Sequence, residues 1–147
     1  MTENITPIAE PDFALEALDR LVGTWGLTGD ATGSVTYRWM PGRRFLIQEG
    51  ELELFGHHNT FTEIIGREKP FGGESSADVK SRTYTAEGDT LDYVYELDGD
   101  TLTIWGGERG SPSAFVGTFD STGDVLAGSW TWPGGGYSTT STRLGPG

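Results

Sequence analysis

An alternation of apolar and polar residues with a period of two runs from Gly23 almost to the C-terminus. Successive side chains of a strand point to opposite faces, so this pattern is typical of strands with one buried face. Short turn signals such as Gly29-Asp30, Pro41-Gly42 and Asp98-Gly99-Asp100 interrupt it, because Gly and Asx residues tolerate the positive φ of tight hairpins. The intervals between turns predict ten strands, at 23–28, 33–40, 44–54, 59–67, 79–85, 90–97, 101–105, 113–119, 125–132 and 137–144.

The only helix that we predict comes before these strands, over 13–21. Asp12 is placed to cap it, Leu15, Leu18 and Val22 follow helical spacing, and Gly23 ends it. Because no helices separate the strands, parallel βαβ units are excluded. Residues 1–11 are expected to form a flexible N-terminal lead, and residues 12–147 a single domain.

The fold class predicted is all-β: an up-and-down antiparallel β-barrel of about ten strands preceded by one short N-terminal helix. A β-sandwich is the alternative, but closure removes the two edge strands of a long meander, and we therefore prefer the barrel. Four glycines, Gly50, Gly66, Gly117 and Gly128, fall within strands, where glycine often marks a bulge or sharp bend.

Charge and composition exclude several classes of partner. The chain has 10 basic and 22 acidic residues, a formal net charge of -12, which disfavours nucleic acid and anionic membrane surfaces. It has no cysteine, which excludes disulfides, thiolate metal sites and a cysteine nucleophile. Residues 1–11 do not resemble a signal peptide, and no stretch approaches the ~20 apolar residues of a membrane helix. We expect a soluble, cytoplasmic protein.

Alternation assigns many aromatic side chains to the inner face, and an aromatic wall with polar tips is typical of a small-molecule site. The lining predicted in this way comprises Tyr37, Trp39, Gln48, Tyr93, Tyr95, Phe115 and Trp130. Strand 44–54 is less regular, because Phe45 and Ile47 fall on the face that bears Glu49. Either a bulge near Gly50 exchanges the faces, or the N-terminal helix or a second subunit covers these two residues; a homodimer is therefore possible.

The segment Leu21-Val22-Gly23-Thr24-Trp25, after a short helix and at the start of the first strand, resembles the Gly-x-Trp signature of the calycin superfamily, which includes lipocalins and fatty-acid-binding proteins. The resemblance implies that Trp25 closes one end of the barrel and that Arg143 packs across it. Residues 39–45 and 104–107 are similar to an uncharacterised bacterial group of lipocalin-like domains, the DUF1579-like type.

The chain departs from two members of that superfamily. The helical lid and the Arg-x-Tyr of fatty-acid-binding proteins are missing, since only Gly29 to Gly33 connect the first strands and Leu144 follows Arg143. The late histidine of haem-binding nitrobindin-like barrels is also missing. We therefore expect neither the carboxylate-binding mechanism of the first nor the haem of the second, and predict no cofactor.

Motifs for catalysis are few. The sequence has no Gly-x-Ser-x-Gly elbow and no Walker A loop. His57 and His58 are adjacent and would point to opposite faces of a strand, so no metal site is predicted, and a solvated turn at 55–59 is preferred over a base formed by His58 with Glu63.

Arg82 and Tyr84 share one face of their strand. If that face points inward, they would orient an anionic or carbonyl-bearing ligand; if it points outward, Arg82 is an ordinary solvated residue. Glu63 and Glu96 are expected to pair with Arg82 or Arg38 at the surface.

These features predict that the protein binds a small, mostly apolar ligand in an aromatic-lined cavity, with Gln48, Arg82 and Tyr84 orienting it. The alternative is a small-molecule cyclase or isomerase that shapes its substrate in the same cavity, for which no catalytic residue is assigned. A third possibility is a protein-interaction domain that uses Phe45 and Ile47 as an exposed apolar strip.

Overall fold

The computed structural model describes residues 11–145; residues 1–10, which include nearly all of the expected N-terminal lead, and residues 146–147 lie outside the described part. Ten strands follow one short helical segment. They are β1 (Gly23–Gly29), β2 (Ala31–Trp39), β3 (Phe45–Leu54), β4 (His57–Gly66), β5 (Val79–Thr85), β6 (Thr90–Asp98), β7 (Thr101–Gly106), β8 (Ala114–Phe119), β9 (Val125–Trp132) and β10 (Gly135–Gly145).

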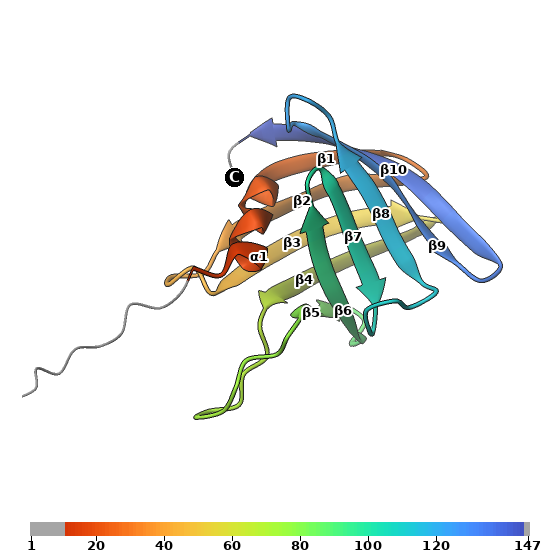
Figure 1. Cartoon of the computed structure of the whole chain (residues 1–147). Coiled ribbons are helices and arrows are strands. Elements are labelled where there is room, and N and C mark those ends of the chain that lie inside the picture. The colour runs from red at the N-terminus through yellow and green to blue at the C-terminus, as the bar shows by residue number, and fades with distance from the viewer. Residues whose placement is uncertain (1–10, 146–147) are drawn as a thin grey trace, which may run out of the picture.

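The strands form one closed antiparallel barrel in up-and-down order (Figure 1). Each strand pairs with its neighbours in sequence, and β1 closes the ring by pairing with β10 from Thr24–Gly145 to Gly29–Thr139. The prediction of an all-β, up-and-down barrel is confirmed, and the sandwich is excluded. Closure leaves both faces of the sheet distinct, one lining the interior and one facing outward.

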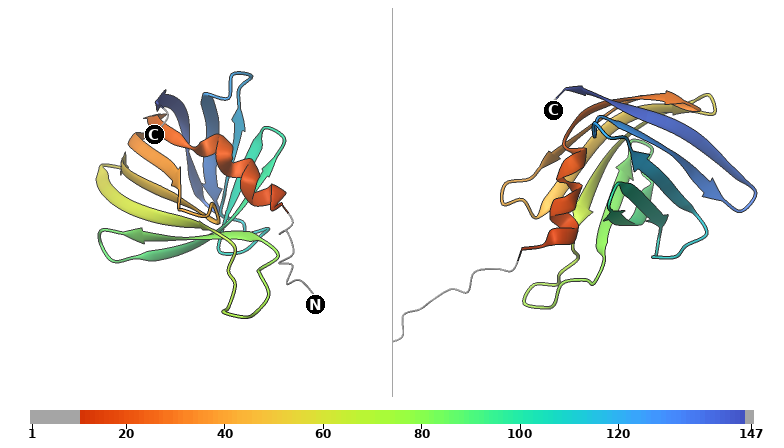
Figure 2. Two further views of the ribbon diagram at one scale, coloured as in Figure 1. Left: turned by 90° about the vertical axis from the view of Figure 1, so that its left-hand side faces the viewer. Right: turned by 45° about the horizontal axis from the view of Figure 1, so that its top comes forward.

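The helical segment lies across one end of the barrel, as Figure 2 shows in the left-hand view. It consists of α1 (Phe13–Glu16) and a 3₁₀ turn, η1 (Ala17–Leu21). Asp12 caps it as expected, because its side chain accepts a hydrogen bond from the backbone N–H of Leu15 at 3.2 Å. Leu15, Leu18 and Leu21 are buried beneath it, so the segment seals this end with apolar side chains.

Trp25 and Arg143 complete the closure of that end. The Trp25 side chain is 1% exposed, and its indole N–H donates to the carbonyl of Leu21 at 2.8 Å. The Arg143 guanidinium lies 4.3 Å from the centre of the indole ring and donates to the carbonyls of Arg20, at 2.8 Å, and Val22. A cation–π contact thus ties the last strand to the first strand and to the end of η1.

The glycines within strands do not mark bulges, so the bulge that we gave as one of two explanations is wrong. Gly117 and Gly128 pair directly in an unbroken β8–β9 register, and Gly50 lies in continuous registers with β2 and β4. A Cβ on Gly128 would lie 2.7 Å from the ring of Phe115, and one on Gly117 would meet the same ring at 2.7 Å. The two glycines therefore provide room for an aromatic ring. The register shift of the β1–β10 pair lies instead between Thr24 and Trp25.

The unbroken register also settles the faces of β3. Leu46, Gln48 and Leu52 point inward, whereas Phe45 lies outside and is 37% exposed. No bulge exchanges the faces, and the N-terminal helical segment does not cover Phe45. Ile47 pairs directly with Ile64 on the outer face, which explains the mixed pattern of both strands.

Neither helical segment within residues 11–145 is long and apolar enough to cross a membrane.

Candidate ligand cavity

A cavity of about 410 Å³ occupies the inside of the barrel. Leu21, Trp25 and Leu102 line it at the end covered by the helical segment. At the other end it is lined by Leu91 and Trp132, which are 44% and 36% exposed. The barrel is therefore closed by the helical segment at one end and reaches solvent at a rim at the other.

Six of the nine residues predicted to contact a ligand line this cavity, and they come from five strands. They are Tyr37, Gln48, Tyr93, Tyr95, Phe115 and Trp130. The period of two assigned them correctly, because the strands that carry them run without bulges.

A row of four inward side chains crosses one wall of the cavity. Tyr37 pairs with Gln48, Gln48 with Glu63, and Glu63 with Thr83, each on the neighbouring strand from β2 to β5. Directly opposed residues of an antiparallel sheet have Cβ atoms about 4.5–5.5 Å apart, so the register alone brings these side chains together. Glu63 stands at the centre of this row.

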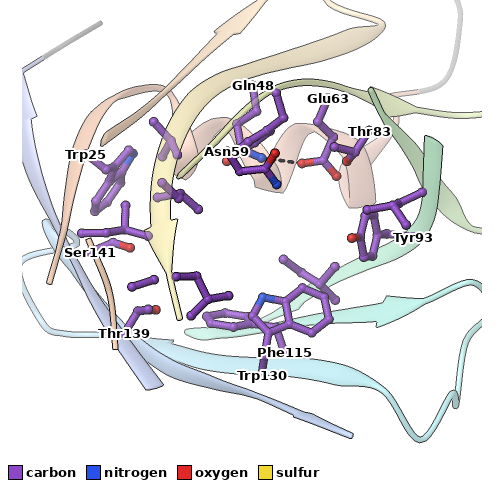
Figure 3. A pocket seen from close by; sticks show the side chains of 18 of the residues that line it. Trp25, Gln48, Asn59, Glu63, Thr83, Tyr93, Phe115, Trp130, Thr139 and Ser141 are labelled. Atoms are coloured by element: carbon purple, nitrogen blue, oxygen red, sulfur yellow. Dashed lines mark hydrogen bonds between the residues drawn. The ribbon is translucent and has the colours of Figure 1, made fainter. Parts of the chain in front are cut away.

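Glu63 is 3% exposed and lies in a dense set of hydrogen-bond donors. The Ser81 hydroxyl donates to Oε2 at 2.6 Å, and the Tyr95 hydroxyl lies 2.8 Å from both carboxylate oxygens. The Gln48 amide N–H donates to Oε1, as the dashed line in Figure 3 shows, and Thr83 adds a further hydrogen bond. We name these five residues, Gln48, Glu63, Ser81, Thr83 and Tyr95, the Glu63 cluster.

No basic side chain is among the residues of the described chain that line the cavity, and Glu63 is the only charged one. Burial raises the pKa of Glu63, because the ionised carboxylate loses its water; the hydrogen bonds from Ser81, Tyr95, Gln48 and Thr83 act in the opposite direction. The protein thus holds a carboxyl group in its interior without supplying a cation to balance it.

Two further tyrosines surround this carboxyl. Tyr37 is 8% exposed, and burial together with the Glu63 charge raises the pKa of its phenol. Burial and the same charge raise the pKa of Tyr93 to about 12. Both phenols line the cavity, and within residues 11–145 no hydrogen bond of either hydroxyl to another residue is found. Since no fully buried side-chain nitrogen or oxygen among the described residues lacks a partner, these two hydroxyls border the space of the cavity and can meet a ligand there.

An aromatic wall lies opposite the Glu63 cluster. The Trp130 ring is 5.7 Å from the Tyr93 ring and 5.9 Å from the Phe115 ring, each at a tilted angle. Figure 3 shows Glu63 and Gln48 on one side of the opening, Trp130 and Phe115 on the other, and the Tyr93 hydroxyl directed between them. The cavity is therefore polar on one side and aromatic on the other.

Three predicted contact residues do not line the cavity. Arg82 and Tyr84 lie on the outer face of β5; Tyr84 is 48% exposed, and Arg82 donates to Asp92 at 2.7 Å. Trp39 is at the end of β2, where its indole N–H donates to Asp19 of η1 at 2.8 Å. The predicted orienting role of Arg82 and Tyr84 is wrong, because Ser81 and Thr83 take the inner face of that strand.

Glu63 itself is the residue that the sequence analysis missed. It was expected at the surface, yet it shares the inner face of β4 with Asn59, Phe61 and Ile65. That alternation was the available signal, but Ile64 next to Ile65 obscured it. The suggested base of His58 with Glu63 is also wrong, because His58 lies outside, 3.9 Å from Glu51.

β4 begins at His57, so the turn expected at 55–59 is shorter than predicted. The Nε2 atom of His57 lies 2.9 Å from Glu87 at the surface. Glu96 pairs with Arg109, and Arg38 with Glu49, all at the surface. Within residues 11–145, no group of three or more His, Asp or Glu side chains is arranged to hold a metal ion.

Neither a protein-family model nor a curated protein matches this sequence.

Proposed function

We propose that the protein binds a small, mostly apolar ligand inside the barrel. The observation that carries this proposal is the cavity of about 410 Å³, which falls within the roughly 300–1,000 Å³ usual for small-molecule sites. Its walls are mostly aromatic and aliphatic, its polar groups are the Glu63 cluster and a few hydroxyl and amide side chains such as Asn59 and Ser141, and its rim reaches solvent. A mostly apolar wall with a few grouped polar atoms is the usual composition of such a site.

We further propose a calycin-like relationship of the DUF1579-like type. Its support is the closed antiparallel barrel with one short helix before β1, together with the contact between Trp25 and Arg143 that the resemblance implied. The absence of cysteine suits the reducing cytoplasm, where we place the protein.

The first experiment is native mass spectrometry of the purified protein, followed by a search for a retained small molecule after denaturation. A molecule released from the wild-type protein and lacking from a variant with a blocked cavity supports the proposal. Ser141→Phe is such a variant, because Ser141 lines the cavity from β10. Thr142→Phe is its matched control, because the neighbouring residue is exposed on the outer face of the same strand.

The second experiment measures binding of a neutral fluorescent apolar dye to the same variants. We expect Ser141→Phe to weaken binding about tenfold or more and Thr142→Phe to leave it within about twofold, since a phenyl ring placed inside a preformed site overlaps the ligand. Equal binding by both variants would place the dye on the outer surface and contradict the proposal.

The alternative function, a cyclase or isomerase, is supported by one observation. A buried carboxyl beside phenols, with a pKa that burial raises, is suited to take and return a proton. The test is to incubate the retained ligand with the protein in D₂O. Carbon-bound deuterium that appears with wild-type protein and not with Glu63→Gln supports catalysis, whereas the same unexchanged ligand with both leaves binding as the function.

A further inference from the structure

We propose that the ligand carries a protonated amine, and that the Glu63 cluster with Tyr37 is the site that receives it. This inference rests on the proposed binding function and specifies its ligand class: an apolar, preferably aromatic, skeleton with one ammonium head group. Four observations support it: the charge of the cavity, the direction of its hydrogen bonds, an unpaired phenol, and the aromatic wall.

The charge of the cavity favours a cation. Glu63 is 3% exposed, and the residues that line the cavity in the described chain bring no Lys, Arg or His to neutralise it. An unpaired buried charge is costly, and an opposite charge within a few ångströms lowers that cost. A cationic ligand supplies the missing counter-charge. An anionic ligand would place a second negative charge beside the first, and the net charge of -12 would repel it during approach.

The hydrogen bonds of the Glu63 cluster favour a donor on the ligand. Ser81 and Tyr95 each donate their only hydroxyl proton to the carboxylate, and Gln48 donates an amide N–H. A hydroxyl whose proton is engaged can only accept from a further partner. With Glu63 ionised, the cluster therefore presents acceptor oxygens to the cavity. An ammonium group offers three N–H donors and no acceptor, so it matches this arrangement.

Tyr37 provides an independent observation. It neighbours Gln48 in the row across the wall, is more than nine-tenths buried, and lines the cavity; within residues 11–145 no hydrogen bond of its hydroxyl to another residue is found. The register pairs Tyr37 with Gln48 and Gln48 with Glu63, so this phenol lies on the same row as the carboxyl, two strands away. The phenol thus borders the cavity beside the Glu63 cluster, where its oxygen can accept a hydrogen bond from a ligand.

The aromatic wall favours the same head group and its skeleton. The rings of Tyr93, Trp130 and Phe115 lie opposite the Glu63 cluster. The centre of the Trp130 ring is 5.7 Å from that of Tyr93 and 5.9 Å from that of Phe115. Aromatic faces attract cations, most strongly when water is excluded, and they pack against apolar rings. An amine held between a carboxylate and aromatic faces is thus stabilised from both sides.

The test compares three probes that share one skeleton and differ in the head group: naphthylethylamine, naphthylethanol and naphthylacetate. Binding of each to the full-length protein is measured by isothermal titration calorimetry near neutral pH. We expect the amine to bind about tenfold or more tightly than the alcohol, and the carboxylate to bind weakest, in keeping with a desolvated charge pair.

Three variants localise the effect. Glu63→Gln removes the charge while keeping the shape, and should weaken amine binding about tenfold or more while changing alcohol binding less than about threefold. Tyr37→Phe should weaken amine binding several-fold and serves if Glu63→Gln folds poorly. Glu53→Gln, on the exposed outer face of β3, removes the same charge from the surface and should leave all three affinities unchanged.

The outcomes separate this inference from the function on which it rests. If the alcohol binds as tightly as the amine, or if Glu63→Gln and Tyr37→Phe both keep the amine preference, the amine assignment is overturned while the cavity remains a binding site. If none of the three probes binds, and the wild-type protein releases no molecule that Ser141→Phe lacks, both proposals fail.

Discussion

At the scale of single residues, Glu63 is the group whose environment departs furthest from that of an ordinary surface carboxyl. Its neighbours on β3, β5 and β6 are polar but uncharged, so hydrogen bonds rather than a counter-charge hold it. Burial is the largest influence on its pKa and raises it. A group with a raised pKa in the folded state binds its proton more tightly there than in the unfolded chain.

The stability of the wild-type protein relative to Glu63→Gln should therefore depend on pH. Below the unfolded-state pKa of about 4.3, Glu63 is protonated in both states and contributes no penalty. Between that pKa and the higher folded-state pKa, the unfolded chain has released its proton while the folded state still holds it, so the wild type loses stability relative to the variant until the pH passes the folded-state pKa.

The measurement is the difference in the free energy of urea unfolding between the two proteins from acid to neutral pH. Taking the difference cancels carboxyls such as Asp12 and Asp92, whose pKa values are lowered by Arg67 and Arg82. A difference that stays constant, or one that grows in favour of the wild type with pH, would show that Glu63 is not buried as described.

The same residue shows where prediction from the sequence ends. Alternation placed Tyr37, Gln48, Tyr93, Tyr95, Phe115 and Trp130 correctly, because each of their strands has one clearly apolar face. Strand β5 has no such face: Lys80 and Arg82 alternate with Ser81 and Thr83, and all are polar. Ser81 and Thr83 of β5 face Glu63 of β4, and that cross-strand pairing is not visible along a single segment.

At the scale of secondary-structure elements, small residues let large ones pack. Gly117 and Gly128 face each other across β8 and β9, and the Phe115 ring lies over both. The sequence revealed that these glycines are unusual within strands but not why, because a bend and a close contact place glycine in the same pattern. Only the register shows that the ladder is continuous at this point.

Gly128→Ala should destabilise the protein by about 1–3 kcal/mol, as overpacking usually does. Its new Cβ would lie 2.5 Å from the Val116 carbonyl oxygen and 2.6 Å from the Gly117 Cα, so backbone has to move. Gly106→Ala is the control, because its Cβ would meet nothing closer than 3.5 Å. Chemical denaturation measures both, and equal stabilities would contradict the proposed close packing.

The stability of the helical segment depends on its N-cap residue, Asp12. Asp12 caps α1 and also pairs with Arg67, whose guanidinium donates to both oxygens at 2.9 and 3.1 Å. We expect Asp12→Ala to cost about 1–2 kcal/mol of unfolding free energy, since it loses the cap and the ion pair together.

Asp12→Asn separates the two effects, because an amide still caps but no longer pairs with a cation. It should recover at least part of the loss in the same denaturation assay. If Asp12→Ala unfolds at the wild-type denaturant concentration, the segment is held by its buried leucines alone.

At the scale of the whole molecule, the barrel is held closed by the pairing of its first and last strands and by Arg143. That guanidinium joins β10 to the carbonyls of Arg20 and Val22 and to Asp124 at 2.8 Å. The overall architecture was predictable from sequence, because ten short strands with tight hairpins leave few arrangements. The Gly-x-Trp resemblance added the specific pair at the closed end.

Arg143→Met should destabilise the protein by about 2–3 kcal/mol, because it leaves partly buried carbonyls without donors while keeping an apolar stem over Trp25. Arg38→Met removes an exposed arginine whose ion pair within residues 11–145 is with Glu49, and should change stability by less than about 0.5 kcal/mol. Urea unfolding followed by tryptophan fluorescence reports on both. Similar losses in the two variants would mean that Arg143 acts only as a surface charge.

The position of Glu63 along its strand has a consequence for how a guest molecule would travel. Strand β4 runs from His57 at the rim to Gly66 at the end under the helical segment, and Glu63 lies nearer the latter. A guest that enters past Leu91 and Trp132 would have to pass its polar head down the whole barrel before that head met its partners. The apolar part of the ligand would then lie near the open rim. The barrel would therefore select strongly for the head group and only weakly for the length of the apolar part.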